Sequence, residues 1–558
     1  MRPEGRDELD SLYFDYPQFD PPASIDSSGR AAVAIVGAGP VGLVAALTLA
    51  RGGVHSVVLE QNSTFNDGSR AICVARQSFH ILERLGAVAP FVEKALGWTT
   101  GRSFYRGQQI LEFQMPHSED EKFLPMYNLQ QQYIERFLWE AASRRPEIEL
   151  RWQSEVTAVE DDGAGVTLQV TDPLRSYTLN AGWVLAADGA RSIVRARRGL
   201  RLEGENYEGR YVIADVQMAH DYPTIRRALF DPACMPGATV LIHRQPDNIW
   251  RIDYQLGEGE SPEEATREAT VRARVSAVLA EIGHQGSWEL EWWSVYSANT
   301  LALADYRDGR IFFVGDSAHI VPIFGVRGLN NGLADAENIG WKLAMVINGD
   351  ACPQLLDSYT PERRGATLDV FANASRSARF MTPPTAGWRL MRDAALSLAL
   401  DHPFAGQFAN PRQMTPYTYA HSPATLADDP AFGAGPVPGA VVPNLRLTGG
   451  DFLSDHLGHG FCGLLFTGPH WELAGELGQL LAEFEPSLRI LRIGPVAGDD
   501  GATVADPDGR IAARFDAMPG SFYLLRPDMH IYGRWRQLVP DRICTALKQY
   551  FHAAREVQ

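Results

Sequence analysis

The chain has 558 residues, of which 45% are hydrophobic and 21% charged, a composition typical of a globular protein with room for two or three domains. Its formal net charge of −17 argues against nucleic acid as the main partner, because phosphate binding needs clustered cations. The five cysteines are scattered and form no Cys-X-X-Cys pair, which favours reduced thiols and a cytoplasmic location.

The first 60 residues predict an irregular extension followed by a nucleotide-binding unit. Residues 1–30 are polar, acidic and aromatic, unlike a signal peptide. Residues 31–50 carry no charge and are long enough to imitate a membrane helix, but their glycine spacing indicates a buried strand, a tight turn and a buried helix. A second strand over 56–59 ends at Glu60, so no membrane association is expected.

Helical and strand patterns alternate from there to about residue 400, and a second series starts after residue 440. Helices are expected over 70–100, 130–145, 262–285, 331–348 and 355–400. Strands are expected over 148–152, 166–170, 211–216, 239–243, 250–256, 311–314, 461–466, 488–493 and 522–527. The stretch between the two series is rich in Pro, Ala and Gly and predicts a linker.

These patterns predict an α/β protein with α+β elements. A sheet domain is expected as an insertion, because the chain returns to the nucleotide-binding fold near residue 311. The expected parts are an N-terminal extension (1–30), a discontinuous nucleotide-binding domain (31–205 and 286–400), a sheet domain (206–285), a linker (401–440) and a C-terminal domain (441–558).

A glycine-punctuated turn follows the first strand, where residues 37–42 read Gly-Ala-Gly-Pro-Val-Gly. A Gly-X-Gly-X-X-Gly turn between a strand and a helix places backbone N–H groups and the helix dipole against a pyrophosphate. Gly37 makes the turn, Gly39 lets the phosphate approach, and Gly42 lets the helix lie close to the sheet. Glu60, about twenty residues on, suits a ribose hydroxyl.

Two further motifs end strands in the same domain. Residues 188–195 read Asp-Gly-Ala-Arg-Ser-Ile-Val-Arg, and residues 315–319 read Gly-Asp-Ser-Ala-His. Taken alone, each is compatible with an ordinary strand–turn–helix junction or a helix N-cap. Together with the glycine turn they indicate one large nucleotide held at three places. Asp316 can accept hydrogen bonds from a polyol chain, which FAD has and NAD lacks, so FAD is the expected cofactor.

These three motifs resemble those of the class A flavoprotein aromatic hydroxylases, the para-hydroxybenzoate hydroxylase-like monooxygenases, over roughly residues 30–400. Segments 68–72, 128–131 and 245–251 are similar to the hydroxyphenylpropionate hydroxylase, phenol hydroxylase and nitrocatechol monooxygenase branch. The resemblance implies a Rossmann-type FAD-binding domain of the glutathione-reductase type, an interleaved substrate sheet and a thioredoxin-like C-terminal domain. That last domain has no Cys-X-X-Cys pair here, so thiol redox chemistry is not implied.

The resemblance also implies where FAD is held. Glu60 would bind the adenosine ribose, Arg70 and Gln131 the pyrophosphate and ribityl regions, and Asp316 the ribityl chain. Backbone from Val326 to Asn330 would face the flavin ring, where a helix N-terminus stabilises the anionic reduced flavin. The full predicted set comprises Gly37, Gly39, Pro40, Val41, Gly42, Glu60, Gln61, Arg70, Gln131, Asp188, Asp316, Gly325, Val326, Arg327, Gly328, Leu329 and Asn330.

Substrate contacts are expected from one loop and one sheet. The family commonly has proline at the position of Ile323, in a segment that lies against the substrate ring, and isoleucine lacks the fixed φ of proline. In 250–256 the even positions form one face of a strand and the odd positions the other. Packing is the alternative for each sheet residue. The candidate substrate contacts are Tyr211, His243, Tyr254, Pro322 and Ile323.

The implied activity is an FAD-dependent monooxygenase that consumes NADH or NADPH and O2, with no metal, and hydroxylates a phenolic aromatic substrate through a flavin C4a-hydroperoxide. The chain has no second Gly-X-Gly-X-X-Gly turn, which fits a family in which the nicotinamide cofactor visits a cleft. Two alternatives stay open: epoxidation, Baeyer–Villiger insertion or oxidative rearrangement of a natural product on the same scaffold, and a non-catalytic flavin-binding protein. A homodimer is one candidate assembly.

Overall fold

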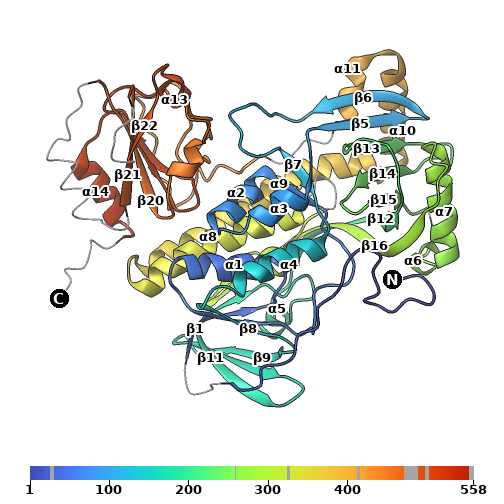
Figure 1. Ribbon diagram of the computed structural model, residues 1–558, viewed down its shortest axis with the longest axis horizontal. Helices are drawn as coiled ribbons and strands as arrows, with labels where there is room; N and C mark the ends of the chain where they lie inside the picture. The colour runs from blue at the N-terminus through green and yellow to red at the C-terminus, as the bar shows by residue number, and fades with distance from the viewer. Residues whose placement is uncertain are drawn as a thin grey trace.

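The computed structural model describes residues 1–25, 30–257, 259–322, 327–410, 415–469, 488–496 and 502–551 (Figure 1). Over these residues it contains two eight-stranded sheets, a five-stranded sheet and a three-stranded sheet. In Figure 1 the five-stranded sheet lies at the left of the molecule and the second eight-stranded sheet at the right, and the nucleotide-binding fold lies between and below them.

The first sheet has the parallel core expected of a nucleotide-binding domain. Its main strand order is β17-β18-β11-β1-β2-β8, and the antiparallel strands β9 and β10 are attached to β11. The strands are β1 (Ala31–Val36), β2 (Ser56–Leu59), β8 (Ile148–Arg151), β9 (Glu155–Asp161), β10 (Val166–Thr171), β11 (Ser176–Ala186), β17 (Arg307–Asp308) and β18 (Ile311–Phe313). The strands β1, β2, β8, β11 and β18 pair in parallel, so their carboxyl ends meet at one edge of the sheet.

Helix α1 (Pro40–Arg51) explains the long apolar run near the N-terminus. It is buried from Gly42 to Ala50, because it lies between the first sheet and helix α8 (Gly328–Asn348). A helix covered on both sides has no solvent-facing stripe and needs no charged residues. None of the helices in the described part of the chain is both long and apolar enough to cross a membrane.

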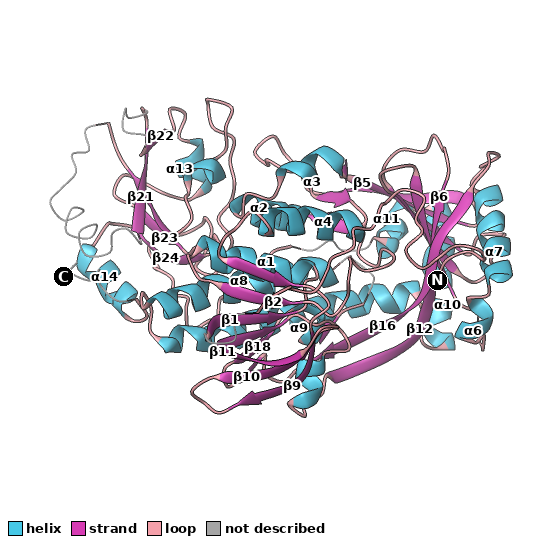
Figure 2. Cartoon of the chain, turned by 60° about the horizontal axis from the view of Figure 1, so that its bottom comes forward, coloured by secondary structure: helices cyan, strands magenta, loops and turns pink. Residues whose placement is uncertain are grey.

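The second sheet is reached through two long paired strands, β12 (Glu203–Gln217) and β16 (Glu289–Ala302), which Figure 2 shows running out of the first domain. The remaining strands are β5 (Thr100–Tyr105), β6 (Gln108–Gln114), β13 (Arg226–Phe230), β14 (Thr239–Arg244), β15 (Ile249–Gln255) and β19 (His319–Ile320). The insertion therefore forms a sheet as predicted, with β13 in addition to the expected strands. The strands β5 and β6 come from an earlier part of the chain.

The two faces of this sheet differ in what covers them. One, the helix face, packs its Val212, Val240 and Ile252 against the apolar side of α7 (Glu268–Glu281). The other, the inner face, packs its Tyr211 and Leu241 against β3 (Cys73–Ala75), β4 (Leu96–Trp98) and the end of α9 (Tyr359–Met381). Both faces are buried, so alternation along a strand does not by itself reveal which face looks toward the nucleotide-binding domain.

Residues 70–100 were expected to be helical, and this prediction is only partly correct. They contain β3 (Cys73–Ala75), α2 (Arg76–Arg84), α3 (Ala89–Lys94) and β4 (Leu96–Trp98). Gly86, with a φ of 71°, ends the helical run after α2. The strands β3 and β4 both pair with β7 (Met126–Asn128), which is distant in sequence, and this tertiary pairing overrides the local helical pattern.

The other helices cover the sheets or connect the domains. The longer ones are α4 (Gln131–Ala142), α9 (Tyr359–Met381) and α10 (Ala386–Asp401), and the short ones are α5 (Ile193–Arg197), α6 (Pro262–Ala265) and α11 (Pro403–Gly406). The N-terminal residues 1–25 have no helix or strand and pack on the main body, where Arg2 forms an ion pair with Asp67 at 2.7 Å. Residues 415–440 likewise contain no helix or strand, whereas the start of the expected linker is helical up to Ala409.

The C-terminal domain has a mixed sheet in the order β22-β21-β20-β23-β24. Its elements are β20 (Phe461–Phe466), β21 (Leu488–Gly494), β22 (Thr503–Ala505), α13 (Arg510–Arg514), β23 (Phe522–Leu525), β24 (Ile531–Trp535) and α14 (Pro540–Lys548). The three strands expected from the sequence are present, and the thioredoxin-like character of the domain stays a prediction.

Candidate active site

The glycine turn has the geometry that a bound pyrophosphate requires. Gly37 has a φ of 104°, and a Cβ placed on it would lie 2.5 Å from the carbonyl oxygen of Ala187. A Cβ on Gly42 would collide with the carbonyl of Gly37, because α1 starts close to the sheet. A Cβ on Gly39 would meet nothing within 4 Å. The open space at Gly39, at the N-terminus of α1, is where a phosphate can approach.

Glu60 lies beside this turn, at the carboxyl end of β2. Its carboxylate accepts hydrogen bonds from the backbone N–H of Ala38 at 2.8 Å and from the backbone N–H of Asn62 at 2.9 Å. Desolvation raises its pKa, while these hydrogen bonds act in the opposite direction. Glu60 as a residue is half-buried, and its role as the ligand of a ribose hydroxyl stays a prediction. Gln61 is exposed next to it.

The second motif, residues 188–195, follows β11, and one oxygen of its aspartate has no hydrogen-bond partner in the described structure. Asp188 Oδ2 accepts a hydrogen bond from the N–H of Val194 at 3.0 Å, whereas its Oδ1 is buried without a hydrogen bond in the described structure. Ser192 caps α5 by accepting from the N–H of Arg195 at 3.0 Å. A buried carboxylate oxygen without a hydrogen bond, at this edge of the sheet, is suited to accept one from a hydroxyl of a bound ligand.

The third motif adjoins the second. Gly315, with a φ of 60°, turns the chain after β18, and its N–H donates to Asp335 at 3.0 Å. Arg195 donates to the carbonyl of Ser317 at 3.0 Å and so joins the two motifs. Asp316 is exposed, although its two neighbours in the chain are buried, and desolvation by the surrounding protein raises its pKa. Its carboxylate therefore faces out of the loop while standing among protein atoms.

Asp335 was not predicted, and it organises the loop that carries Asp316. It lies on α8, is fully buried, and forms ion pairs with His319 and Arg363, each at 2.6 Å. These two partners lower its pKa in spite of desolvation. No local sequence signal distinguishes an aspartate in a helix as the anchor of a loop that ends sixteen residues earlier.

The segment expected at the flavin ring is described in part. Pro322 is buried, Arg327 is buried, and α8 begins at Gly328 with Leu329 half-buried. Ile323, Gly325 and Val326 lie outside the described residues.

Asn330 is the anchor of the same helix start. Its side-chain oxygen accepts hydrogen bonds from the N–H of Ala75 at 2.8 Å and from the hydroxyl of Ser78 at 2.7 Å. Its side-chain nitrogen donates to the carbonyl of Cys73 at 3.1 Å. The start of α8 is thereby fixed to β3 and α2.

The side chains of Gln131 and Arg70 differ in whether they can contact a ligand. The side-chain oxygen of Gln131 accepts from the N–H groups of Arg70 and Ala71, both at 3.2 Å, and its nitrogen donates to Glu135 at 2.8 Å. Gln131 therefore holds the loop in place, whereas the Arg70 side chain is exposed and available to a ligand.

The predicted substrate contacts on the second sheet divide between its two faces. Tyr211 and His243 lie on the inner face, since β12 and β14 pair there with Gln255 and Arg251 of β15. Tyr254 lies on the helix face and packs among the apolar residues of α7. Its selection as a substrate contact was therefore wrong on geometric grounds: the even positions of β15 point toward α7 and away from the nucleotide-binding fold.

The inner face holds polar residues that were not selected. Arg251 forms a two-pronged ion pair with Asp215, with both contacts at 2.8 Å, and also donates to the carbonyls of Ser69 and Arg70. It thus ties the sheet to the loop that precedes β3. Asp253 is buried on the same face, and desolvation raises its pKa to about 7 in spite of Arg251. The signal in the sequence was the row of polar residues at the odd positions of an otherwise apolar strand.

Comparison with known proteins agrees with this geometry. A family model described as FAD binding domain matches residues 30–374. A 3-(3-hydroxy-phenyl)propionate/3-hydroxycinnamic acid hydroxylase of Mycolicibacterium smegmatis is 27% identical over 542 residues, which cover 95% of this chain and 94% of that protein. A para-nitrophenol 4-monooxygenase of Pseudomonas sp. is 29% identical over 353 residues, which cover 62% of this chain and 86% of that protein.

A solved structure has the same fold over nearly the whole chain. The flavin-dependent monooxygenase PieE, in complex with FAD and substrate, superposes with a TM-score of 0.76 at 23% identity, covering 94% of this chain and 100% of that one. The matched family model spans the glycine turn, the Asp188 motif and the Asp316 loop, which the first sheet brings to one edge. The chain belongs to the FAD-binding-domain family of flavin-dependent aromatic monooxygenases.

Proposed function

We propose that this protein hydroxylates a phenolic aromatic compound, with FAD as cofactor and NADH or NADPH and O2 as co-substrates. One observation carries the proposal: the parallel strands β1, β11 and β18 end together and place Gly39, Asp188 and Asp316 at one sheet edge. The hydroxylase relatives, of which one covers 95% of this chain, support the reaction class.

The residues of the chain would bind and orient the cofactor. FAD, when bound, supplies the reduction and oxygen chemistry. The turn at Gly39 and the Asp316 carboxylate would hold its pyrophosphate and ribityl chain. The N-terminus of α8, fixed by Asn330, presents a positive helix end to negative charge near the ring.

Asp253 is the residue that we propose as proton acceptor for the phenol. It lies buried on the inner face with its Oδ1 unpartnered in the described structure. Removal of the phenol proton makes the ring more electron-rich and thus more easily attacked by an electrophilic oxygen. The groups that interact electrostatically with Asp253 include Arg226, Arg251, Asp215 and Cys73.

The C-terminal domain we propose to be thioredoxin-like and structural. Its cysteines Cys462 and Cys544 are both buried, which offers no accessible dithiol for exchange.

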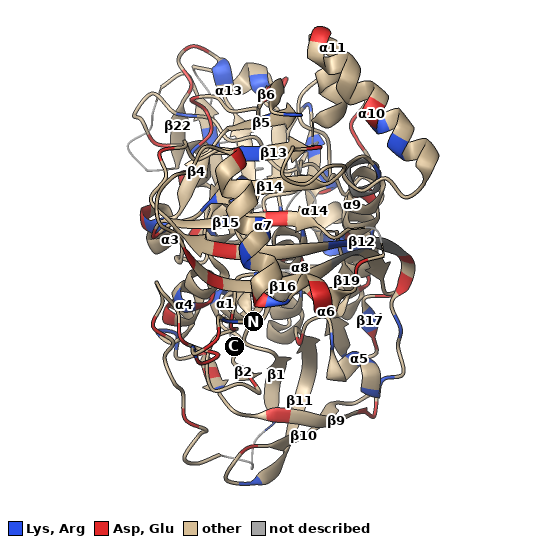
Figure 3. Cartoon of the chain, turned by 90° about the vertical axis from the view of Figure 1, so that its right-hand side faces the viewer, with Lys and Arg blue, Asp and Glu red and all other residues tan. Residues whose placement is uncertain are grey.

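The proposed setting is the cytoplasm, in agreement with five free cysteines in the structure. Small aromatic molecules are the proposed partners rather than nucleic acid, and Figure 3 shows acidic and basic positions interspersed along the elements of one side of the molecule. A homodimer is the proposed assembly, and light scattering of the purified protein tests it.

The proposed activity is tested with purified FAD-loaded protein and a panel of phenols, hydroxylated aryl acids and nitrocatechols. Substrate-stimulated oxidation of NADH or NADPH together with a product that has gained one oxygen atom supports hydroxylation. If no phenol stimulates that oxidation, or if the product reflects epoxidation, ring expansion or rearrangement, the proposal is wrong. Purified protein that cannot be loaded with FAD would contradict the whole cofactor assignment.

A further inference from the structure

The N-terminal residues 1–25 lie against parts of both eight-stranded sheets, and Arg2 contacts an acidic residue on each side. It forms an ion pair at 2.7 Å with Asp67, in the loop after β2 of the first sheet, and another with Glu291, on β16 of the second sheet. The side chain of Arg2 is 3% exposed and that of Glu291 1%, whereas that of Asp67 is 29% exposed. One buried guanidinium thus joins a loop of the first sheet to a strand of the second.

Glu291 fastens the first twelve residues of the chain to β16. Its carboxylate accepts hydrogen bonds from the hydroxyl of Ser11 at 2.6 Å and from the N–H of Leu12 at 2.9 Å. The guanidinium of Arg6 lies 3.4 Å from the same carboxylate. A buried carboxylate keeps such charge-assisted partners, because it would be costly to leave it without them. Arg2 therefore has a fixed place beside β16.

Aromatic side chains further along the same segment pack on the nucleotide-binding fold. The ring of Phe14 lies 5.3 Å from that of Tyr133 on α4 and 6.4 Å from that of Phe65. Phe19 stacks on Trp152, next to β8, at 4.1 Å. The N-terminal residues are therefore anchored at both ends, with the contact between Arg2 and Asp67 at the β16 end.

The loop that Arg2 contacts also carries Arg70. Gly68 has a φ of 76°, and a Cβ placed on it would overlap the ring of Trp292, so the loop lies directly on β16. The side chain of Arg70 is exposed and forms no hydrogen bond with the residues that the structure describes. Desolvation raises the pKa of Asp316, and the charge of Arg70 acts in the opposite direction. Arg70 is thus close enough to the predicted ribityl loop to influence its carboxylate.

The two ends of the loop 67–70 are anchored by different parts of the chain. At its end, Arg251 on β15 donates hydrogen bonds to the carbonyls of Ser69 and Arg70. At its beginning, the side chain of Asp67 is anchored by Arg2, from the N-terminal residues. Loss of Arg2 would free the beginning of the loop and leave its end in place.

We propose that Arg2 is a positioning residue for the cofactor: by holding Asp67 against β16, it keeps the loop in the shape in which Arg70 contacts FAD. This rests on FAD as the cofactor of the proposed function and on the predicted contact of Arg70 with it. A loop that is ordered before FAD arrives needs no ordering when FAD binds. The ordering of a single residue otherwise costs about a factor of five to thirty in affinity.

The experiment titrates FAD into the apoprotein without substrate and follows the flavin fluorescence. Arg2→Met and Asp67→Asn should each weaken FAD binding by about fivefold to thirtyfold, because each removes the same ion pair. Arg2→Lys keeps the charge but lacks the planar fork that contacts two carboxylates, so its affinity should lie between those of Arg2→Met and the unaltered protein.

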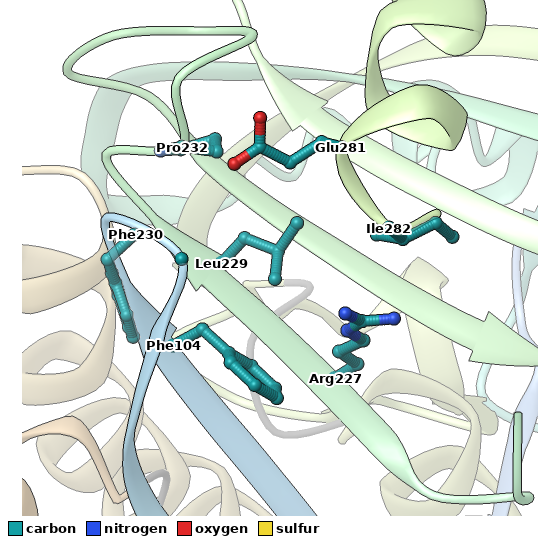
Figure 4. A pocket seen from close by; sticks show the side chains of 8 residues that line it. Phe104, Arg227, Leu229, Phe230, Pro232, Glu281 and Ile282 are labelled. Atoms are coloured by element: carbon teal, nitrogen blue, oxygen red, sulfur yellow. The ribbon is translucent and has the colours of Figure 1, made fainter. Parts of the chain in front are cut away.

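Two arginines serve as matched controls and should bind FAD unchanged when replaced by methionine. Arg6 belongs to the same N-terminal segment and pairs with Glu289 and Glu291 but not with Asp67. Arg227 lies on β13, four strands from β16 in the second sheet, in the pocket that Figure 4 shows. Weakened binding in Arg6→Met equal to that in Arg2→Met would mean that any damage to the segment suffices, and would overturn the specific role of Arg2.

A double-mutant cycle separates positioning from general stabilisation. Arg70→Ala should weaken FAD binding by itself, and Arg2→Met added to Arg70→Ala should cause no further loss, because the side chain that Arg2 positions is gone. An equal loss from Arg2→Met in both backgrounds would overturn the proposal, and so would unchanged affinity in Arg2→Met and Asp67→Asn. If Arg2→Met does not fold, Asp67→Asn carries the test, since Glu291 keeps its arginine there.

These outcomes are separable from the proposed function. Unaltered protein that binds FAD but hydroxylates no phenol would contradict the hydroxylase assignment, while the affinities of the variants still decide the role of Arg2. Arg2→Met with unchanged FAD affinity would overturn the positioning role, while a phenol-stimulated oxidation of NADH or NADPH would still support the hydroxylase.

Discussion

Asp316 is exposed in a loop whose other residues are buried, and no hydrogen bond within the described structure occupies its carboxylate. Asp316→Ala is therefore expected to lower FAD affinity by about tenfold to a hundredfold, the value of one hydrogen bond to a charged group. Flavin titration of the apoprotein measures this. Asp508→Ala, which removes an exposed aspartate from the C-terminal domain, is the control. Unchanged affinity in Asp316→Ala would mean that this residue does not hold the cofactor.

The pKa of Asp253, which lies near 7, predicts how the rate of product formation depends on pH. If it accepts the phenol proton, the rate of product formation should rise as pH passes through about 7 and then level off. Asp253→Asn should lose about a hundredfold or more in rate and lose this pH dependence, in the range typical of a general base. Tyr254→Phe, the next residue on the opposite face, should keep both. A variant Asp253→Asn with the unaltered pH profile would exclude Asp253 as the base.

The same carboxylate predicts how stability depends on pH. Its pKa is about 7 in the folded protein and about 4 in an unfolded chain, so the folded state binds the proton more tightly. Its contribution to stability is fully present below pH 4 and is lost as pH rises to 7 and above. The stability of Asp253→Asn, measured relative to that of the unaltered protein, should therefore be greater at pH 8 than at pH 5. Urea unfolding at both pH values measures the difference, and an equal difference at both would contradict a shifted pKa.

At the residue scale, the sequence pointed to the acidic residues that directly follow strands. It did not point to the residues that hold the neighbouring loops in place. The acids at 60, 188 and 316 follow apolar runs in a fixed order, and this order is legible along the chain. Asp335 and Asn330 act on loops that are distant in sequence, so nothing beside them reveals their role. Tyr254 was named as a candidate substrate contact and Asp253 was not, because the position of α7, which decides which face of β15 is available, cannot be read from the strand alone.

At the scale of single elements, the strand–turn–helix unit from β1 to α1 separates two roles of glycine. Gly39 has a φ of −67°, which alanine also adopts, and a Cβ there meets nothing within 4 Å. Gly39→Ala should fold with normal apoprotein stability and lose FAD, because the new methyl group occupies the phosphate's space. Gly42→Ala should instead lower stability, since its Cβ would strike the carbonyl of Gly37.

Melting temperatures of the two apoproteins, together with flavin absorbance per protein after gel filtration, test this pair. Equal loss of stability in both variants would mean that Gly39 is also a packing position. Retention of FAD by Gly39→Ala would contradict a phosphate at the turn.

Helices and strands could be predicted where one hydrophobic periodicity dominates a segment. They could not be predicted where a strand forms only by pairing with a segment distant in sequence. The uncharged run from 31 to 50 could be assigned because glycines divide it into a strand and a helix. The run from 70 to 100 could not, because β3 and β4 exist only through their pairing with β7. For the same reason β5 and β6 joined the second sheet unforeseen: β6 pairs with β5, and β13, the other partner of β5, lies more than a hundred residues further along the chain.

At the scale of the whole molecule, the C-terminal domain is joined to the flavin-binding fold by a buried network of charges. Arg526, in the turn between β23 and β24, forms ion pairs with Glu362 of α9 and with Asp528, each at 2.6 Å. Lys342 of α8 pairs with the same Glu362 at 2.6 Å. All these side chains are at most 2% exposed. Arg526 and Glu362 are separated by 164 residues, so the sequence contained no sign of their pairing.

This network continues toward the cofactor. Arg363, the neighbour of Glu362 on α9, forms the ion pair with Asp335, and Asp335 in turn holds the N–H of Gly315 beside Asp316. One helix thus contacts the C-terminal domain with one side chain and the ribityl loop, through Asp335, with the next. Disturbance of the domain interface should therefore weaken FAD binding as well as the fold.

Arg526→Met tests that connection. Loss of one member of a buried ion pair leaves Glu362 and Asp528 without their shared cation, which typically costs about 3–5 kcal/mol. We expect the urea unfolding midpoint to fall and FAD to dissociate more readily, although Arg526 has no contact with the predicted cofactor site. Arg489→Met, which removes an exposed arginine from β21 of the same domain, should change neither quantity. A lower midpoint with unchanged FAD affinity would confine the network to a structural role, and an unchanged midpoint would contradict its contribution to stability.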